Sequence, residues 1–463
     1  MPDGLSDGES AVYMKLLFVH QHLGAWGGAE ANIQTTAREL VRRGHTVALA
    51  HAEMTGRGVE TAREAFSECF QLPSADTKAA VAAFVRRFEP DLIYLHHLQD
   101  LDVFEQLLET GIPVVRMVHD HSLYCLRSYK YNPLTRKICT RAASVACVFP
   151  CLGTIQRNRG GALPVKWASY SRMRKEMRLT GQCRRLVAYS EHSRNELVRN
   201  GFAANKILLH VPLEMPAEET ITPSFSERNL IVFAGQVIRG KGVDLLLKAL
   251  SKVSVPFECH ILGDGSHRAA CERLADKLGL GSRVRFEGFI PAAELHKMYA
   301  DASMLVVSSV WPEPFGLVGP EAMRYGLPVV AFDAGGIREW LLDRVNGFLA
   351  PWADTDAFAA RVEQLLRNKT LAREMGRRGK ERVLREYAVS LQVENLENLF
   401  LEVVRETPVT VLEKTAAGCA ATLEEEAAGA GVYLHSEPAA TALPALSPVG
   451  LEESNPLHTR SYQ

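Results

Sequence analysis

The sequence lacks an apolar run long enough to cross a bilayer, so we expect no membrane-spanning helix. The apolar stretch 14–19 is too short for a signal peptide and has no small-residue cleavage site after it. Net charge is nearly absent: 53 Lys and Arg face 54 Asp and Glu, which argues against general binding of nucleic acids. With 47% hydrophobic and 23% charged residues, the 463-residue chain is typical of a soluble globular protein of two or three domains.

Cysteine is present but forms no C-x-x-C pair, so the strongest sequence signal for a structural metal is missing. Because there are nine cysteines, an odd number, and no secretion signal, we expect a cytoplasmic protein in a reducing environment. Their thiolates either form a structural zinc or iron–sulfur site or are unlinked thiols in an insertion. The four cysteines of that segment are separated by 13, 7 and 3 residues: Cys125, Cys139, Cys147 and Cys151.

Apolar runs of strand length alternate with helical patterns along most of the chain, which predicts parallel sheets flanked by helices. A first set of strands is expected at 15–20, 45–51, 92–96, 114–119, 186–190 and 207–211. A second set is expected at 229–234, 258–262, 284–288, 303–309 and 327–332. The alternation predicts an α/β protein with two Rossmann-like, doubly wound domains that face each other across a cleft.

Shifts in composition indicate where these parts begin and end. The termini are polar or rich in Ala, Pro, Glu and Ser, which predicts disorder, and the expected hinge is rich in Pro, Glu, Thr and Ser. The expected parts are a disordered extension at 1–13, a first Rossmann-like domain at 14–212 with an insertion at 122–185, a hinge at 213–228, a second Rossmann-like domain at 229–388, a C-terminal helix at 389–406 and a disordered tail at 407–463.

The stretch 311–323, Trp-Pro-Glu-Pro-Phe-Gly-Leu-Val-Gly-Pro-Glu-Ala-Met, has the most specific pattern in the chain. Its first two prolines end a strand and force an extended loop, while Pro320 suits the first turn of a helix. Glu313 then lies on the loop and Glu321 in the first helical turn, with an anion-favouring helix start at 316–318 between them. Two carboxylates around an anion site suit a nucleotide-diphosphate sugar. Alternatively, Glu321 complements the helix dipole and Glu313 is solvated.

Glycine-rich turns between predicted strands and helices are the other candidate contacts of such a ligand. Paired glycines at 27–28 let the backbone approach a ligand, although they form no G-x-G-x-x-G motif. The turn at 235–242 combines glycines with basic side chains and fits either a phosphate site or a solvated turn. An aromatic ring just beyond the strand at 284–288 is placed to pack on a base. The candidate contacts in these segments are Gly27, Gly28, Gln236, Arg239, Lys241, Gly263 and Phe289.

Histidines gather at the predicted carboxyl ends of two neighbouring strands, as His96-His97 and His119-Asp120-His121. Ligands of parallel α/β sheets bind at this edge. A single histidine there is more often structural than catalytic, but two groups at adjacent strand ends favour a catalytic role.

A basic stretch lies within the expected insertion. Residues 157–185 contain nine Lys and Arg against one acid, Glu176, and apolar residues such as Trp167 interrupt them. This composition fits peripheral contact with an anionic membrane at the cytoplasmic face, an acidic acceptor, or an ordinary solvated helix face.

Taken with these motifs, residues of about 14–400 resemble a GT-B glycosyltransferase of the large retaining family 4. The resemblance is strongest in the E-x7-E pattern from Glu313 to Glu321. Further support comes from Gly-Gly-Ala-Glu at 27–30, Lys-Gly at 241–242 and Gly-Gly-Ile-Arg-Glu at 335–339.

The resemblance implies roles for individual residues. Glu313 would hold sugar hydroxyls, Glu321 the ribose, and Lys241 would neutralise the diphosphate. His119 matches the family's strand-end histidine near the reacting centre, so the implied catalytic residues are His119, Lys241 and Glu313. The implied lining of the donor site is Phe315, Gly316, Leu317 and Val318, faced by Gly27 and Gly28 from the other domain.

The implied reaction moves a sugar, with retention, from a UDP- or GDP-sugar to a glycan, lipid or small-molecule acceptor. It implies front-face attack and needs no cofactor and no catalytic metal. Three departures from the family pattern stand out: Gln236 replaces the usual arginine of the phosphate turn, residues 210–214 read His-Val-Pro-Leu-Glu instead of the common Asn-Gly-Val-Asp, and the cysteine-bearing insertion is not universal in the family. Two other functions stay open, a non-catalytic sugar-nucleotide-binding partner subunit and a nucleotide-sugar epimerase.

Overall fold

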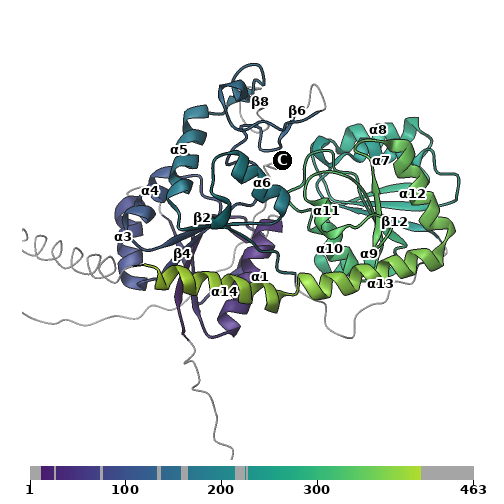
Figure 1. Ribbon diagram of the computed structural model, residues 1–463. Helices are drawn as coiled ribbons and strands as arrows, with labels where there is room; N and C mark the ends of the chain where they lie inside the picture. Colours follow the sequence, from purple (N-terminus) through teal and green to yellow (C-terminus); the bar gives the residue numbers. More distant parts are fainter. Residues whose placement is uncertain are drawn as a thin grey trace, which may run out of the picture.

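Two parallel sheets, each flanked by helices, organise the computed structural model of the chain (Figure 1). The structure describes residues 12–24, 28–72, 77–132, 137–157, 165–213, 225 and 228–407. Most of the predicted extension, hinge and tail, as well as Gly27, lie outside these residues. None of the described helices is long and apolar enough to span a membrane.

The first sheet has seven parallel strands in the order β11-β10-β5-β4-β1-β2-β3. Its strands are β1 (Lys15–Leu23), β2 (Thr46–Met54), β3 (Glu68–Gln71), β4 (Leu92–Leu95), β5 (Val114–Met117), β10 (Arg185–Ala188) and β11 (Ile207–Leu209). The helices between them are α1 (Gly28–Arg42), α2 (Val59–Arg63), α3 (Thr77–Phe88), α4 (Leu101–Glu109), α5 (Tyr170–Gln182) and α6 (Glu191–Arg199). The apolar strands have side chains buried on both faces, as parallel sheets require.

The predicted insertion between β5 and α5 forms small irregular elements at one end of this sheet (Figure 1). Two antiparallel hairpins pair β6 (Tyr131–Asn132) with β7 (Lys137–Ile138) and β8 (Ile155–Arg157) with β9 (Val165–Trp167). A 3-10 helix, η1 (Val145–Cys147), lies between the hairpins in the chain.

The second sheet has six parallel strands in the order β14-β13-β12-β15-β16-β17. They are β12 (Leu230–Ala234), β13 (Glu258–Leu262), β14 (Val284–Gly288), β15 (Met304–Val307), β16 (Val329–Phe332) and β17 (Gly347–Ala350). The accompanying helices are η3 (Arg239–Lys241), α7 (Val243–Leu250), α8 (Arg268–Lys277), α9 (Ala292–Asp301), α10 (Val318–Met323), α11 (Ile337–Trp340), α12 (Thr355–Arg367) and α13 (Lys369–Glu386).

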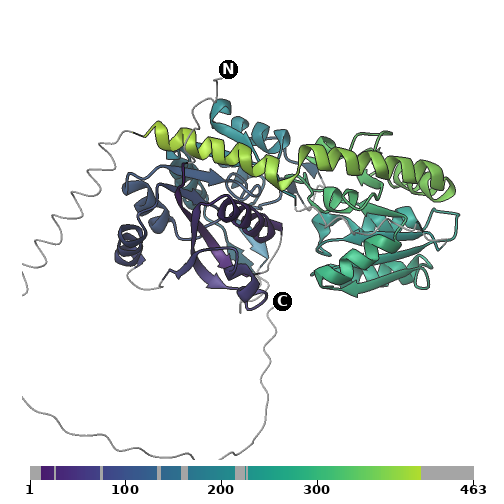
Figure 2. The same ribbon diagram turned by 90° about the horizontal axis from the view of Figure 1, so that it is seen from below.

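The last helix returns to the first domain. Helix α14 (Val389–Arg405) packs on α1, while α13 stays with the second domain, and the two run along the same side of the molecule (Figure 2). Phe400 is fully buried with its ring 5.1 Å from that of Tyr94. Near the α13–α14 junction the backbone of Leu213 donates to Tyr387. The chain therefore crosses twice between the domains, side by side.

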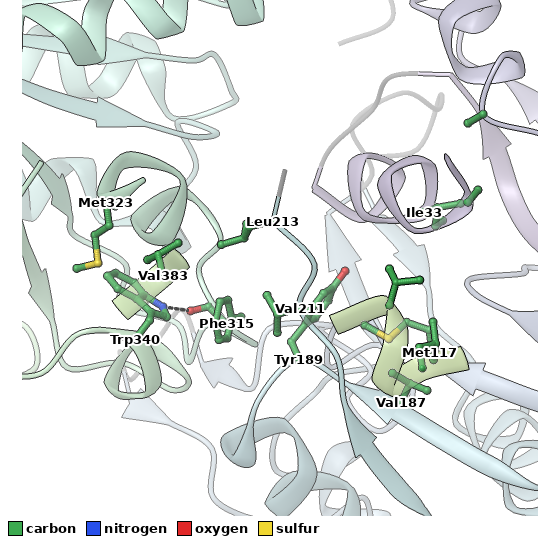
Figure 3. Close-up of a cluster of buried hydrophobic side chains, with 14 of the residues drawn as sticks. Ile33, Met117, Val187, Tyr189, Val211, Leu213, Phe315, Met323, Trp340 and Val383 are labelled. Atoms are coloured by element: carbon green, nitrogen blue, oxygen red, sulfur yellow. Dashed lines mark hydrogen bonds between the residues drawn. The ribbon is translucent and has the colours of Figure 1, made fainter. Parts of the chain in front are cut away.

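Buried apolar side chains continue from one domain to the other (Figure 3). Val211 and Leu213 of the crossing segment lie between Tyr189 of the first domain and Phe315 of the second (Figure 3). This continuity holds the two sheets in a defined relation, so a site can be built from both. The α/β architecture with two Rossmann-like domains is confirmed, whereas the exact domain boundaries stay a prediction.

Candidate functional site

Each sheet has a switch point where its strand order reverses, and these are the places where ligands bind in such folds. In the first sheet the switch lies between β1 and β4, and in the second between β12 and β15. The segment after β4 contains His96 and His97, the segment after its neighbour β5 contains His119 and His121, and the segment after β15 contains the loop with Glu313. The fold therefore brings the two groups of candidate residues to the strand ends predicted for them.

Glu313 is the centre of a hydrogen-bond network in the second domain. Its side chain is only 4% exposed, and its Oε1 atom lies 2.7 Å from Lys241 Nζ. The indole N–H of Trp311 donates to the same oxygen at 2.8 Å, and the Ser309 hydroxyl also donates to it. All three donors reach Oε1, and no side chain of the described residues donates to Oε2. The Lys241 ammonium also lies 5.1 Å from the Trp311 ring centroid.

Glycines allow this loop to pack so closely. A Cβ on Gly335 (φ +68°) would lie 2.4 Å from the Glu313 carbonyl oxygen, and one on Gly242 (φ +65°) would lie 2.1 Å from that of Ser308. Such contacts are impossible for any other residue, so both turns require glycine. They fix the backbone on either side of the Lys241–Glu313 pair.

The first domain holds the same loop from the other side. His121 Nε2 lies 2.8 Å from the Pro312 carbonyl oxygen, to which it donates. The hydroxyls of Ser190 and Ser193 both donate to the carbonyl of Pro314. The loop with Glu313 is therefore bonded to residues of both domains.

A second bond pair between the domains involves the start of α6. The Glu339 carboxylate accepts the backbone N–H of Glu191 and that of His192, both at 2.9 Å. A carboxylate at a helix N-terminus satisfies otherwise unpaired N–H groups and complements the helix dipole. Burial nevertheless raises the pKa of Glu339, and the two N–H bonds oppose that rise.

His119 lies at the end of β5 within a chain of aromatic polar groups. Its Nδ1 is 2.7 Å from the Tyr189 hydroxyl and its Nε2 is 2.9 Å from His96 Nδ1. Burial holds the pKa of His119 well below its usual range, and the nearby His20, His97 and Arg116 lower it further. The imidazole is therefore neutral, and both ring nitrogens are already bonded. To exchange a proton with a substrate, His119 must first give up one of these bonds.

Gly28 of the first glycine turn lies close to the second domain, whereas its role toward a donor stays a prediction. A Cβ on Gly28 would lie 3.2 Å from Leu317 Cδ1. Beyond this turn, Glu30 lies 3.1 Å from His20 Nε2, and both are almost fully buried. Among the described residues, His20, His22 and Glu30 are the only three potential metal ligands with ligand atoms within 4.8 Å of one another.

Several predicted donor contacts lie where the sequence placed them. Gln236 and Arg239 are exposed in the turn after β12, and Gly263 (φ +133°) ends β13 against Gly235. Phe289 follows β14 with 73% of its surface exposed, and its ring centroid lies 5.8 Å from the guanidinium carbon of Arg57 in the first domain. These placements leave the roles of the four predicted residues as predictions.

Phe315 of the E-x7-E stretch is more buried than we expect of a residue that lines the donor site. Its ring is 2% exposed and packs edge-on against Tyr387. Its neighbours Gly316, Leu317 and Val318 are partly exposed. Glu321 is partly buried within α10, and burial raises its pKa, which Arg324 opposes.

Two family models match most of this chain. Residues 26–209 match the family model of Glycosyltransferase Family 4, and residues 215–382 match that of Glycosyl transferases group 1. The chain belongs to the GT-B, family 4-type glycosyltransferases.

Curated relatives of this family match shorter segments. An uncharacterized glycosyltransferase of Methanocaldococcus jannaschii is 35% identical over 145 residues, 30% of this chain and 36% of that protein. A D-inositol 3-phosphate glycosyltransferase of Xylanimonas cellulosilytica is 35% identical over 163 residues, 33% of this chain and 39% of that protein. The chain thus spans less than half the length of these curated relatives.

Solved structures match the fold over most of its length. The Anabaena protein HepE in complex with UDP and glucose gives a TM-score of 0.65 at 19% identity, and the match covers 84% of this chain and all of HepE. Sucrose-phosphate synthase of Thermosynechococcus elongatus gives 0.65 at 18%, covering 84% of this chain and 99% of the synthase. The fold is therefore that of GT-B glycosyltransferases.

This family 4-type chain does not gather its insertion cysteines into a metal site. Cys125, Cys139, Cys147 and Cys151 are free thiols, and none is part of a set of three potential ligands within 4.8 Å in the described residues. The hairpins and the 3-10 helix hold them on separate turns. The alternative of unlinked thiols in an insertion fits the structure, so the suggested structural metal is not supported.

Three contacts of this glycosyltransferase were missed in the sequence. Trp311 was quoted only as part of a motif, although an indole N–H next to a buried glutamate is a signal of a bond to it. Tyr189 lies within the predicted strand at 186–190 and has no other sequence feature that indicates a contact. The capping of α6 by Glu339 depends on a contact between domains that sequence spacing does not reveal.

Proposed function

We propose that this protein transfers a sugar from a nucleotide-diphosphate sugar, a UDP- or GDP-sugar, to a glycan, lipid or small-molecule acceptor. The observation that carries the proposal is the Lys241–Glu313 pair at the switch point of the second domain, 2.7 Å apart and bonded to both domains through its loop. The reported complexes of HepE with UDP, glucose and UDP-glucose support a nucleotide-sugar donor on this fold.

The chemistry follows from where charge develops. When the bond between the sugar and the diphosphate breaks, negative charge builds on the leaving group, and fixed cations nearby stabilise it. Lys241 is held within the site, and Arg239 is two residues away in the same turn. Glu313 Oε2 then accepts from sugar hydroxyls. No described carboxylate other than Glu313 lies in this network, so we propose front-face attack with retention.

The acceptor lies against the first domain, at the strand ends that contain His119. In this proposal His119 acts as a neutral hydrogen-bond partner near the reacting centre. If the acceptor is borne on a lipid, the protein must contact an anionic membrane surface, and this peripheral contact is part of our proposal. No cofactor is proposed.

A thermal-shift screen against UDP-, GDP- and ADP-sugars tests the donor, because a ligand that binds only the folded state raises Tm. With the donor known, Lys241→Ala and Glu313→Ala are each expected to lower transfer at least about a hundredfold, the scale of lost electrostatic groups at a reacting centre. Glu374→Gln, an exposed change on α13, is the matched control. Near-normal rates in both site variants would refute the site.

A non-catalytic sugar-nucleotide-binding subunit is the second candidate, favoured by Gln236 in place of the usual arginine. It predicts a nucleotide-dependent rise in Tm without turnover of any acceptor, and Gln236→Arg would then gain activity. An epimerase would convert the donor alone into its epimer. Incubation of the donor without acceptor, followed by chromatography of the sugar, separates an epimerase from a transferase.

A further inference from the structure

The insertion between β5 and α5 exposes an unusual number of large apolar side chains. Those of Val145, Phe149 and Trp167 are 75%, 76% and 77% exposed. Leu152, Ile155 and Val165 add partly exposed aliphatic groups at 42%, 38% and 38%. We call these six residues the insertion patch. A soluble surface rarely groups such side chains unless something covers them.

The local structure exposes the side chains of the insertion patch. In the β8–β9 hairpin, Ile155 and Trp167 are direct cross-strand partners and therefore share one face. On the other face Gln156 donates to the Leu126 carbonyl, while its cross-strand partner Lys166 is exposed. The turn after η1 exposes Phe149, and the Ile155 N–H donates to the Leu152 carbonyl, so this turn leads directly into β8.

The charge around the patch is strongly one-sided. Residues 137–178 contain nine Lys and Arg but one acid, Glu176, and that acid is paired with Arg116. The net charge of the whole chain is −1, so the rest of the chain has a negative net charge that balances this basic region. Exposed cations without an ion pair among the described residues include Lys166, Arg174 and Arg178.

We propose that the insertion patch docks on the surface of an anionic lipid bilayer, which rests on the proposed function in that it would deliver a lipid-borne acceptor. Exposed Trp, Phe and aliphatic groups enter the headgroup region, and the surrounding cations attract anionic lipids. A free polyanion would engage the cations but leave six apolar side chains in water. An anionic bilayer is the partner that contacts both the exposed apolar side chains and the surrounding cations.

The position of the patch relative to the site supports this choice. In Figure 1, β6 and β8 lie at the end of the first domain next to the second domain. Tyr129 of the same insertion contacts Trp311, which bonds Glu313. A membrane at the patch would therefore present an acceptor headgroup close to the proposed donor.

Cosedimentation with phosphatidylcholine vesicles, with and without phosphatidylglycerol, tests the proposal at low and high salt. The full chain should bind the anionic vesicles, and salt should weaken the binding. Phe149→Ser with Trp167→Ser should weaken it at least about tenfold, and Lys166→Glu about fivefold or more, the scale of one surface charge. The controls should not weaken binding: Leu384→Ser with Leu391→Ser changes two apolar side chains on α13 and α14 that are 43% and 40% exposed, and Lys277→Glu changes a cation on α8.

The outcomes separate docking from catalysis. Nucleotide-induced thermal shifts should be unchanged in the patch variants, so loss of vesicle binding with normal shifts supports docking alone. Binding of heparin but not vesicles, equal binding of neutral vesicles at all salts, or a patch-dependent dimer by light scattering would each overturn the proposal. If vesicles bind but no sugar nucleotide does, docking survives and the proposed function fails.

Discussion

The ring of Tyr129 meets that of Trp311 edge-on, with the centroids 5.0 Å apart and the planes at 61°. Tyr129 belongs to the insertion of the first domain, and Trp311 belongs to the loop of the second. The Trp311 indole N–H also donates to Glu313. The Trp311 side chain therefore lies between Tyr129 of the insertion and the carboxylate that we propose binds the sugar donor. The insertion is thus part of the wall of the site, which composition alone did not suggest.

Tyr129→Ala should lower donor turnover by roughly two- to tenfold, the worth of one aromatic pair. The expected reason is that Trp311 and Glu313 lose a fixed orientation, so kcat should fall more than the donor's KM rises. Tyr129→Phe keeps the ring and should restore the rate. Steady-state kinetics of the three proteins check this, and an equal loss in the alanine and phenylalanine variants would contradict it.

Secondary structure was largely predictable because local pattern determines it. The strands expected at 258–262 and 284–288 have the same bounds in the structure, as β13 and β14. The predicted strand at 15–20 is longer in the structure, since β1 continues to Leu23 and presents its last histidines at the switch point. β3 and α9 gave weak periodic signals and were missed.

The site was predictable where it depends on motifs and unpredictable where it depends on packing between domains. Glu313 and Lys241 are brought together as their separate turns suggested. The burial of Phe315 was missed because its motif neighbours are exposed, and only the return of Tyr387 near α14 creates its pocket. Pairings such as Ser190 with Pro314 likewise need both domains in place.

Glu339→Ala should loosen the contact between the domains. The variant leaves the N–H groups of Glu191 and His192 without their carboxylate, and charge-assisted hydrogen bonds of this kind stabilise by about 1.5–3 kcal/mol each. We expect an about tenfold higher KM for the donor and a larger radius of gyration in small-angle scattering. Glu339→Gln retains one acceptor oxygen and should be intermediate.

Glu381→Gln, an exposed change on α13, serves as the control for that experiment. A normal KM and an unchanged scattering curve for Glu339→Ala would show that the bonds to α6 do not hold the domains together.

His210 should make folding stability depend on pH. Its Nδ1 lies 3.0 Å from the Gln392 carbonyl oxygen and its Nε2 3.2 Å from the Thr36 hydroxyl, and complete burial lowers its pKa to about 4. Because the unfolded chain binds this proton near pH 6.5, stability is full above pH 6.5 and is lost as the pH falls toward 4. The loss amounts to about 3 kcal/mol for this shift.

His210→Gln removes this titration and keeps a polar side chain. The free energy of unfolding in urea, measured at several pH values between 7 and 4.5, should therefore fall less steeply in the variant than in the native protein. His192, whose pKa burial also lowers to about 4, remains in both proteins and contributes the same slope to each. Identical slopes would contradict the assignment to His210.

Phe400 tests whether α14 is structurally part of the first domain. The ring is fully buried against Tyr94, and the helix is fixed nearby by Glu397, which lies 2.9 Å from both Arg43 Nη1 and His45 Nε2. Phe400→Ala should cost about 3–5 kcal/mol of the free energy of unfolding, as large-to-small changes in a core do. Leu391→Ala, on the same helix but 40% exposed, should change it by less than about 0.5 kcal/mol. Urea unfolding followed by circular dichroism measures the free energy of unfolding of both variants. Equal small losses would mean that the packing of α14 does not stabilise the first domain.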